Sequence, residues 1–284
     1  MSRRLSIRRC LAALVLTAMA VLAGGLPPVA AEEIYLVGAT LHPVSGPVIP
    51  GGILHVSDSR IAAVGADLEV PQGARVIDLA GKHLYPAFVH AASVLGLTEV
   101  SAVAATVDSS ESGDLNPELA VEVAFHGDSR LLEATRAAGV LYAHVLPRGG
   151  VLSGTSAVMR LEGWNWQDMV VEAPVGLHLR YPAVLASGRS FGPRPPKTQS
   201  EVDEERKERV EAVETLFEDA RAYAAARLAS SRPLAYDAKL EALLPALDGR
   251  LPLFLHAEEK KQIEAGLDFV EKLEIPRVVL VSSA

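Results

Sequence analysis

The sequence predicts an α/β fold in which a small all-β unit precedes a region of alternating strands and helices. Residues 34–78 hold short apolar runs separated by glycine, proline and polar turns, which is typical of a small sheet. Leu84–Val89 is a continuous apolar run, as expected for a strand buried on both faces of a parallel sheet. Asp128–Ala138 then has helical spacing, Gly139 ends it, and Val140–Leu146 is again an apolar strand. This strand–helix–strand order is the signature of βαβ units.

The N-terminus has the pattern of a secretory signal. Four arginines lie between residues 3 and 9, an apolar run follows at Leu11–Ala23, and small residues suited to cleavage stand at Val29–Ala31. The apolar run has 13 residues, whereas a membrane span needs about 20, so a membrane anchor is the weaker interpretation. Ser2-Arg3-Arg4 leaves the twin-arginine export route open. We therefore expect residues 1–31 to be removed and the mature protein to be exported to the bacterial periplasm, free of the membrane.

Cysteine usage and charge exclude several kinds of function. Cys10 is the only cysteine and lies within the signal, so the mature chain can form no disulfide and offers no thiolate to a metal. Any metal must therefore be held by His, Asp, Glu or a modified Lys. Losing four arginines and no acids takes the formal net charge from −8 to −12. A chain this acidic is not expected to bind nucleic acid through its phosphates.

The remaining elements are indicated by their own patterns. In the small unit, four short runs alternate with turns; they are Ile34–Val37, Gly51–Val56, Arg60–Gly65 and Arg75–Leu79, with the turn Ser57–Ser59 between the second and third. Glu201–Ala229 has an apolar stripe at helical spacing and acids in its first turn, which indicates a long helix. The glycines near residue 150 indicate a turn, because the ending required for a phosphate-binding loop is missing. We also expect a short strand at Ala157–Leu161, helices at Leu240–Leu247 and Lys260–Leu273, and strands at Leu251–His256 and Arg277–Val281.

Histidines near strand ends are the main candidates for chemistry, because functional side chains of a parallel barrel stand at the C-terminal ends of its strands. His256 ends the strand in PLFLHAEE, where it could ligate zinc or form a hydrogen bond in the core. His90 follows the first strand of the region, whereas His144 lies inside a strand, where a structural role is favoured. The other histidines, at 42, 55, 83, 126 and 178, have no partner at ligand spacing, and no HxH, HExxH or HxxxH pair occurs. Ser153 and Ser156 have no identifiable base, and no GxSxG motif is present.

Four separated blocks of the chain resemble the amidohydrolase superfamily, in particular its exported branch similar to imidazolonepropionases and prolidase-like metal-dependent peptidases. The blocks are GKHLYPAFVHAASVLGLTEV, NPELAVEVAFHGDS, GVLYAHVLPRGGVLSGTSAVMRLEGWNWQDM and LPLFLHAEEKKQI. They occur in the family's order and extend the resemblance over nearly all of residues 33–284. The resemblance implies a (β/α)8 TIM-type barrel preceded by a small β-sandwich unit. Residues 32–83 would be the first sandwich part and residues 84–284 an incomplete barrel, so we expect the chain to be part of a longer reading frame.

The resemblance also implies a divalent metal, such as zinc, and hydrolysis of non-peptide C–N bonds. In the family, the first barrel strand carries Asp-x-His-x-His, whose two histidines bind the metal. Here His90 stands for the aspartate, and Ala92 and Val94 stand for the histidines, so both ligands are replaced. His256 corresponds to a later ligand histidine, while Ser282 and Ser283 lie where the next one is expected.

Three hypotheses follow. In the first, the protein is a catalytically impaired amidohydrolase-like protein that binds a small molecule or pairs with an active homologue, with no metal required. In the second, it is an active C–N hydrolase whose remodelled metal site uses His90 and His256. In the third, it is a periplasmic small-molecule binding module unrelated to hydrolysis. The sequence does not identify the substrate.

Overall fold

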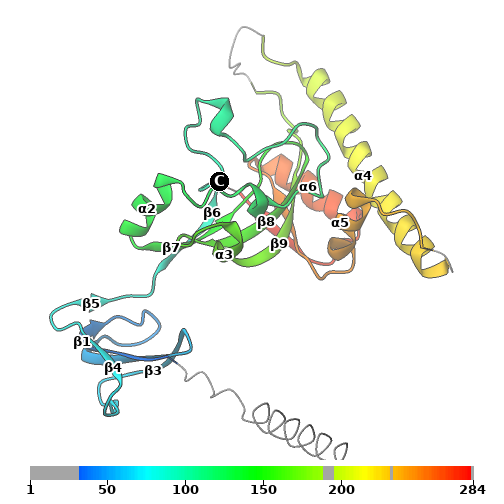
Figure 1. The fold of residues 1–284 in the computed structure, drawn as a ribbon. Coiled ribbons are helices and arrows are strands. Elements are labelled where there is room, and N and C mark those ends of the chain that lie inside the picture. Colours follow the sequence, from blue (N-terminus) through cyan, green and yellow to red (C-terminus); the bar gives the residue numbers. More distant parts are fainter. Residues whose placement is uncertain (1–31, 188–194, 231–232, 283–284) are drawn as a thin grey trace, which may run out of the picture. The chain divides into compact units, whose positions relative to one another are not determined.

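The computed structural model describes residues 32–187, 195–230 and 233–282 of the chain. They form two compact units, the first ending at Pro86 and the second beginning at Ala87 (Figure 1). The predicted boundary lay at residue 83. The predicted signal, residues 1–31, lies outside the described residues, as does Ser283. No helix in the described ranges is long and apolar enough to cross a membrane.

The first unit is a small sheet. Its strands are β1 (Glu33–Leu41), β2 (Ile49–Ser57), β3 (Arg60–Gly65) and β4 (Arg75–Asp78), in the order β3-β2-β1-β4, and the short β5 (His83–Leu84) also pairs with β1. The neighbours β1, β2 and β3 are antiparallel, whereas β4 and β5 run parallel to β1. Asp58 and Ser59 connect β2 to β3 with φ of 48° and 60°, as a tight hairpin turn requires. The four predicted strands and this turn are therefore confirmed.

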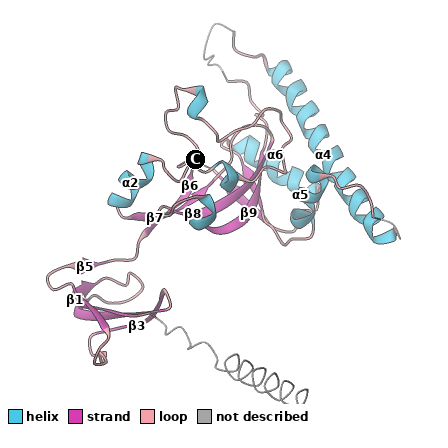
Figure 2. Ribbon diagram, viewed as in Figure 1, coloured by secondary structure: helices cyan, strands magenta, loops and turns pink. Residues whose placement is uncertain are grey.

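The second unit is built on a six-stranded sheet in the order β11-β10-β9-β8-β7-β6, curled into a half-barrel (Figure 2). The strands are β6 (Phe88–Ser93), β7 (Val140–Val145), β8 (Leu152–Arg160), β9 (Val170–Arg180), β10 (Leu253–His256) and β11 (Val278–Val281). β6 is parallel to β7, and β9, β10 and β11 are parallel to one another. β8 is antiparallel to both of its neighbours. The α/β class and an incomplete barrel beside a small sheet unit are as predicted.

Three of the sequence predictions about strands are wrong in detail. Leu84–Val89 is not one buried strand, because Leu84 belongs to β5 and β6 starts at Phe88. Phe88 and Val89 are 69% and 60% exposed, since within the described residues β6 pairs only with β7. The strand expected at Ala157–Leu161 is the longer β8, and β9 was not predicted. β9 carries acidic and proline residues in its first half, which hide its strand pattern.

Helices and loops cover one face of this sheet. The helices α4 (Gln199–Ala229), α5 (Ala238–Leu247) and α6 (Lys260–Lys272) pack on β9 and β10 in a single core. The helices α2 (Arg130–Ala137) and α3 (Trp166–Met169) and the 3₁₀ turn η2 (Val121–Ala124) pack on β7 and β8 in a second core. A further 3₁₀ turn, η1, spans Ala104–Thr106. The larger predicted helices are confirmed to within two residues at each end.

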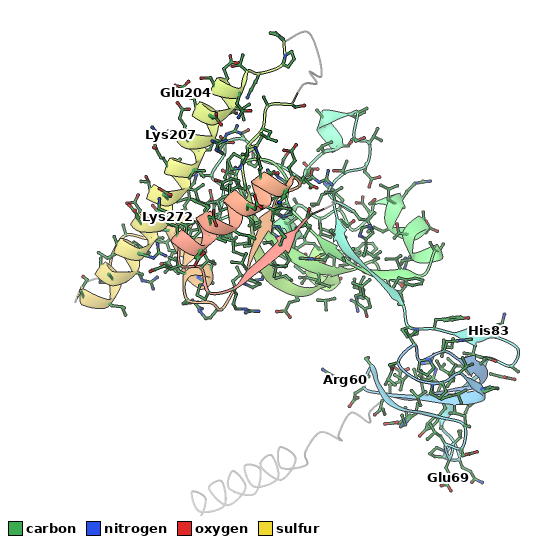
Figure 3. The ribbon with its side chains drawn as sticks, turned by 180° about the vertical axis from the view of Figure 1, so that it is seen from behind. Arg60, Glu69, His83, Glu204, Lys207 and Lys272 are labelled. Carbon is green, nitrogen blue, oxygen red and sulfur yellow. The ribbon has the colours of Figure 1, made fainter. Side chains whose placement is uncertain are left out.

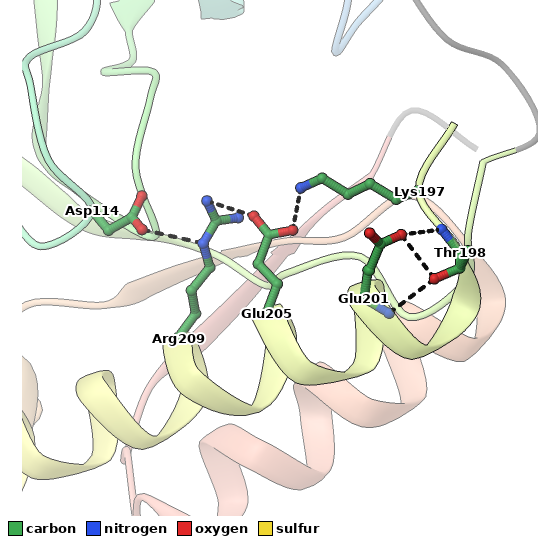
Figure 4. A network of polar contacts seen from close by, with 6 residues as sticks. All are labelled: Asp114, Lys197, Thr198, Glu201, Glu205 and Arg209. Atoms are coloured by element: carbon green, nitrogen blue, oxygen red, sulfur yellow. Dashed lines mark hydrogen bonds and ion pairs between the residues drawn. The ribbon is translucent and has the colours of Figure 1, made fainter. Parts of the chain in front are cut away.

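Helix α4 has a well-defined beginning. The Thr198 hydroxyl accepts a hydrogen bond from the Glu201 N–H, and the Glu201 carboxylate accepts one from the Thr198 N–H, which forms a capping box (Figure 4). About two turns further on, Arg209 bridges Glu205 and Asp114, at 3.0 and 3.1 Å, and so ties the helix to the loop between η1 and η2. Charged side chains such as Glu204 and Lys207 project from the outer side of the helix (Figure 3). Both side chains are exposed to solvent.

Candidate functional site

The candidate site lies on the face of the second sheet that the helices leave uncovered. Side chains of a strand alternate between the two faces of its sheet. In β7, β9 and β10 the fully buried residues of one face pack into the two helical cores: Ala143, Val145, Leu177, Leu179, Leu253 and Leu255. The residues between and beside them face the other way. We call this second set the inner face; it comprises His144, Ser156, His178, Arg180, Phe254 and His256.

Two buried histidines contact each other at the centre of the inner face. His178 Nδ1 lies 2.8 Å from His256 Nε2, so one imidazole donates a hydrogen bond to the other. Their exposed fractions are only 1% and 7%. His178 Nε2 is closed to solvent and has no hydrogen-bond partner among the described residues. The pair therefore holds one buried nitrogen, on His178, whose hydrogen-bonding capacity is unused.

Aromatic packing fixes this pair. The Phe254 ring stacks on His178 with centroids 4.9 Å apart and meets His144 edge-on at 5.5 Å. Gly176 makes room for the ring, because a Cβ there would lie within 3.0 Å of two ring carbons. Gly176 is thus required by the close approach of Phe254 and not by an unusual backbone angle.

His144 joins the edge of this cluster. Its Nε2 lies 2.8 Å from the Ser156 hydroxyl and its Nδ1 lies 3.1 Å from the Ala91 carbonyl oxygen, so both nitrogens have partners. The centroids of the His144 and His178 rings are 6.2 Å apart. His144 therefore connects β6 to the buried pair, while its own hydrogen-bonding capacity is already used.

All three imidazoles are neutral near pH 7. Burial lowers the pKa of His178 to about 2, and the neighbouring His256 and His144 act in the same direction. Burial also lowers the pKa of His256 to about 4, with a further contribution from the charge of Arg180. Burial lowers the pKa of His144 as well, and its hydrogen bond with Ala91 opposes this only in part. The cluster can therefore offer lone pairs or N–H groups, but no positive charge of its own.

The positive charge of the site comes from arginine. Arg180 ends β9 and is in register with His256 across the parallel pair, so both stand at the C-terminal end of the strands. Its backbone N–H donates to the Val151 carbonyl, which places it beside the loop that carries Arg148. Burial, and next the charge of Arg148, lower the pKa of Arg180, while Glu258 opposes them.

The structure places the predicted site residues as follows. His256 is buried at the end of β10, in contact with His178. His90 is exposed on β6 and in register with Ala143, which belongs to the helix-covered face. Ala92 is exposed and Val94 is half-buried, and their hydrocarbon side chains offer no atom to a metal.

Sequence reasoning missed His178 and the role of His144. Spacing along the chain could not connect residues 178 and 256, because only the pairing of β9 with β10 brings them together. The signal that could have found His178 is the strict alternation in GLHLR, residues 176–180, where two leucines point to the core and the residues between them point away. The remaining histidines lie outside this cluster: His42 contacts His83 at 2.9 Å, His126 contacts Asp108 at 2.9 Å, and His55 contacts Glu33.

The described residues do not fit a catalytic divalent metal. No group of three or more His, Asp or Glu side chains in this part of the chain is arranged to hold one. Two imidazole nitrogens about 2.1 Å from a tetrahedral zinc would lie about 3.4 Å apart, whereas those of His178 and His256 lie 2.8 Å apart, at hydrogen-bond distance. Catalytic zinc has about three protein ligands, and His144 cannot supply the third while both its nitrogens are engaged.

Comparison with known proteins agrees with this architecture. No protein-family model matches the chain, and neither does any curated protein. Among solved structures, the crystal structure of an amidohydrolase from Thermotoga maritima MSB8 matches with a TM-score of 0.72 at 23% sequence identity, over 87% of this chain and 63% of that one. This chain has the amidohydrolase fold. The predicted resemblance to the superfamily is confirmed at the level of the fold.

Other solved structures match less well. A prolidase complexed with N-methylphosphonate-L-proline gives a TM-score of 0.39 at 12% identity, over 87% of this chain and 60% of that one. The chain spans 63% of the length of the Thermotoga amidohydrolase. The activity of the whole protein is therefore a matter for proposal.

Proposed function

We propose that the chain belongs to an exported, periplasmic protein of amidohydrolase fold that binds a small molecule on its inner face, and in which metal-dependent hydrolysis of C–N bonds is impaired. The observation that carries this proposal is the His178–His256 pair, in which the strand-end histidine is hydrogen-bonded to a second histidine. The replacement of the first-strand ligand positions by Ala92 and Val94 supports it, because neither residue can coordinate a metal.

Binding is supported by the polar character of the inner face. A buried imidazole nitrogen without a partner costs about 1–3 kcal/mol, so a protein selected for stability alone would replace His178 by an apolar residue. The cluster also stands near the C-terminal ends of parallel strands, where barrel folds place their ligands. A ligand would meet the part-exposed Arg180 and the less buried of the two histidines, His256.

An active C–N hydrolase with a remodelled metal site is the second candidate. It is favoured by His256 at the strand end, which is held neutral and would have a lone pair for a metal on Nδ1 if its Nε2 donated to His178. The two candidates differ in the metal content of the purified protein: the second requires a stoichiometric amount of metal, and the first does not. Pairing with an active homologue is compatible with the first candidate only.

The test combines metal content with ligand binding. The purified protein is assayed by elemental analysis, for hydrolysis of small amides and lactams with and without a chelator, and for thermal stabilisation by the same compounds. We expect metal at background, no chelator-sensitive turnover, and stabilisation by some of the compounds. His178→Gln should remove this stabilisation, while His126→Gln, which changes an exposed histidine paired with Asp108, should keep it. About one metal ion per chain together with chelator-sensitive hydrolysis would contradict the proposal and establish the remodelled hydrolase.

A further inference from the structure

A second pair of histidines lies in the first unit, apart from the inner face. His42 directly follows β1, and His83 lies on β5, the short strand that runs parallel to β1 (Figure 3). Thr40 is opposite His83 in the register of the two strands. The ladder continues past this position, because the His42 N–H donates to the Leu84 carbonyl oxygen. Side chains two residues apart on a strand point to the same face, so His42 lies on the face that carries Thr40 and His83.

The rings of this pair contact each other near the surface. His42 Nε2 lies 2.9 Å from His83 Nδ1, so one ring donates a hydrogen bond to the other. The Tyr85 ring stacks on His42, with centroids 4.1 Å apart and planes 9° apart, and it is 59% exposed. His42 is half-buried, whereas His83 is exposed. The stack therefore holds the His42 ring in place, while the His83 side chain has room to turn.

The distance between the two nitrogens suits a metal ion whose neighbouring ligands meet at right angles. Two imidazole nitrogens that lie about 2.0–2.1 Å from a metal, at right angles to each other, are about 2.8–3.0 Å apart. The observed 2.9 Å falls in this range, whereas tetrahedral zinc would need about 3.4 Å. Square-planar or tetragonal sites of nitrogen and oxygen ligands are typical of Cu²⁺ and Ni²⁺, and imidazole suits both ions.

Both rings can turn a lone pair toward such an ion. A neutral imidazole carries its proton on either nitrogen and a lone pair on the other. With the protons on His42 Nδ1 and His83 Nε2, the two facing nitrogens can both coordinate. No group of three or more His, Asp or Glu side chains within the described ranges is arranged to hold a metal. Water would therefore complete the coordination, and the exposed position of His83 admits it.

Exposure distinguishes this pair from the histidines of the inner face. The facing nitrogens of His178 and His256 are also close, at 2.8 Å. Their side chains are only 1% and 7% exposed, and the Phe254 ring stacks on His178. A site with two protein ligands needs water at its remaining positions, and a buried pair is closed to that water.

We propose that His42 and His83 form a surface site for a divalent transition metal of tetragonal geometry, Cu²⁺ in particular. Copper is expected to bind most tightly, because affinity for a given set of ligands rises along the first-row series to Cu²⁺. The proposal is independent of the proposed function, since both residues belong to the first unit and the inner face belongs to the second. With only two protein ligands, the metal should exchange with the buffer and be lost on dialysis. Purified protein would then still carry metal at background.

The experiment titrates the purified protein, without an affinity tag, with Cu²⁺. Calorimetry measures the stoichiometry and the affinity, and electron paramagnetic resonance shows how many nitrogens coordinate the ion. We expect about one Cu²⁺ per chain with two imidazole nitrogens, and no binding of Mg²⁺, which takes oxygen ligands. His83→Gln and His42→Gln should each weaken binding by more than about tenfold, because losing even an outer partner of a metal ligand costs about 10–100-fold.

Three controls separate coordination from folding and from unspecific binding. His126→Gln changes an exposed histidine paired with Asp108, and it should keep the copper affinity. Tyr85→Phe keeps the ring that stacks on His42 and removes only the hydroxyl, so it should keep the affinity as well. The melting temperature of His83→Gln should match that of the wild type, because an exposed substitution changes the free energy of unfolding by less than about 0.5 kcal/mol.

The outcomes distinguish this site from the inner face. Loss of copper binding in both single variants, with retention in the His126 and Tyr85 variants, supports the site. The proposal is refuted if the double variant His42→Gln/His83→Gln binds Cu²⁺ as tightly as the wild type. It is also refuted if His256→Gln, and not His83→Gln, removes the copper signal, because the metal would then lie on the inner face and favour the remodelled hydrolase. Failure of the surface site by itself leaves ligand binding on the inner face untouched.

Discussion

The packing of Phe254 over Gly176 allows the architecture of the inner face to be tested with one methyl group. In Gly176→Ala, the new Cβ would lie within 3.0 Å of Cδ2 and Cε2 of Phe254 and 3.2 Å from the carbonyl oxygen of Pro252. Ordinary carbon contacts are about 3.5–4.0 Å long, so the ring would have to move by about 1 Å. The ring cannot do so freely, because it stacks on His178 at 4.9 Å and contacts His144 at 5.5 Å.

The expected cost follows from this overpacking. Added methyl groups in a filled core destabilise by about 1–3 kcal/mol. For a unit of this size, about 2 kcal/mol corresponds to a melting temperature lower by about 4–8 °C. Urea unfolding, followed by a signal from the second unit, measures the change in the free energy of unfolding. Gly46→Ala, in the first unit, is the control for the substitution itself: a Cβ there meets nothing within 4 Å, and the free energy of unfolding of the second unit should change by no more than about 0.5 kcal/mol.

A double-mutant cycle shows whether the ring is the cause. Phe254→Leu alone should destabilise the protein, but combined with Gly176→Ala the loss should be clearly smaller than the sum of the two single losses. Equal stability of Gly176→Ala and the wild type, or strict additivity in the cycle, would refute the described packing of the inner face.

Two further predictions concern the histidine pair. His256→Leu alone should lower the free energy of unfolding by about 1–3 kcal/mol, because it leaves a second buried nitrogen of His178 unpaired. Adding His178→Phe should restore or raise the free energy of unfolding, and it should abolish ligand binding. A double variant that is less stable than the single one would contradict this prediction. The free energy of unfolding should also fall in acid. Histidine in the unfolded chain is protonated near pH 6.5, whereas the pKa of His256 in the folded protein is about 4. The contribution of His256 to stability is therefore complete above pH 6.5 and is lost as the pH falls toward 4. Between about pH 7.5 and about pH 5 we expect His256 to account for a loss of about 2 kcal/mol, measured by urea unfolding, and His256→Gln should flatten the profile by that amount; identical profiles would show that the histidine is not held neutral by burial.

The sequence alone determined the class of this fold and most of its elements. Long amphipathic helices such as α4 and α6 were predicted closely, because helical spacing and capping are local properties of the chain. The small sheet was predicted for the same reason, since its turns are marked by the residues that form them. That Ala92 and Val94 offer no atom to a metal could also be read from the sequence, because it depends on the chemistry of two residues and not on their placement.

The inner face was decided by the tertiary structure. The antiparallel β8 and the unpredicted β9 stand between β7 and β10, and this order joins His144, His178 and His256, which are far apart in sequence. Burial then lowers the pKa values of these histidines and of Arg180, and this effect cannot be read from a residue's identity. Local patterns specify elements, because their periodicity is encoded in neighbouring residues. A site depends on which strands pair and in what register, and that is settled by the packing of the whole sheet.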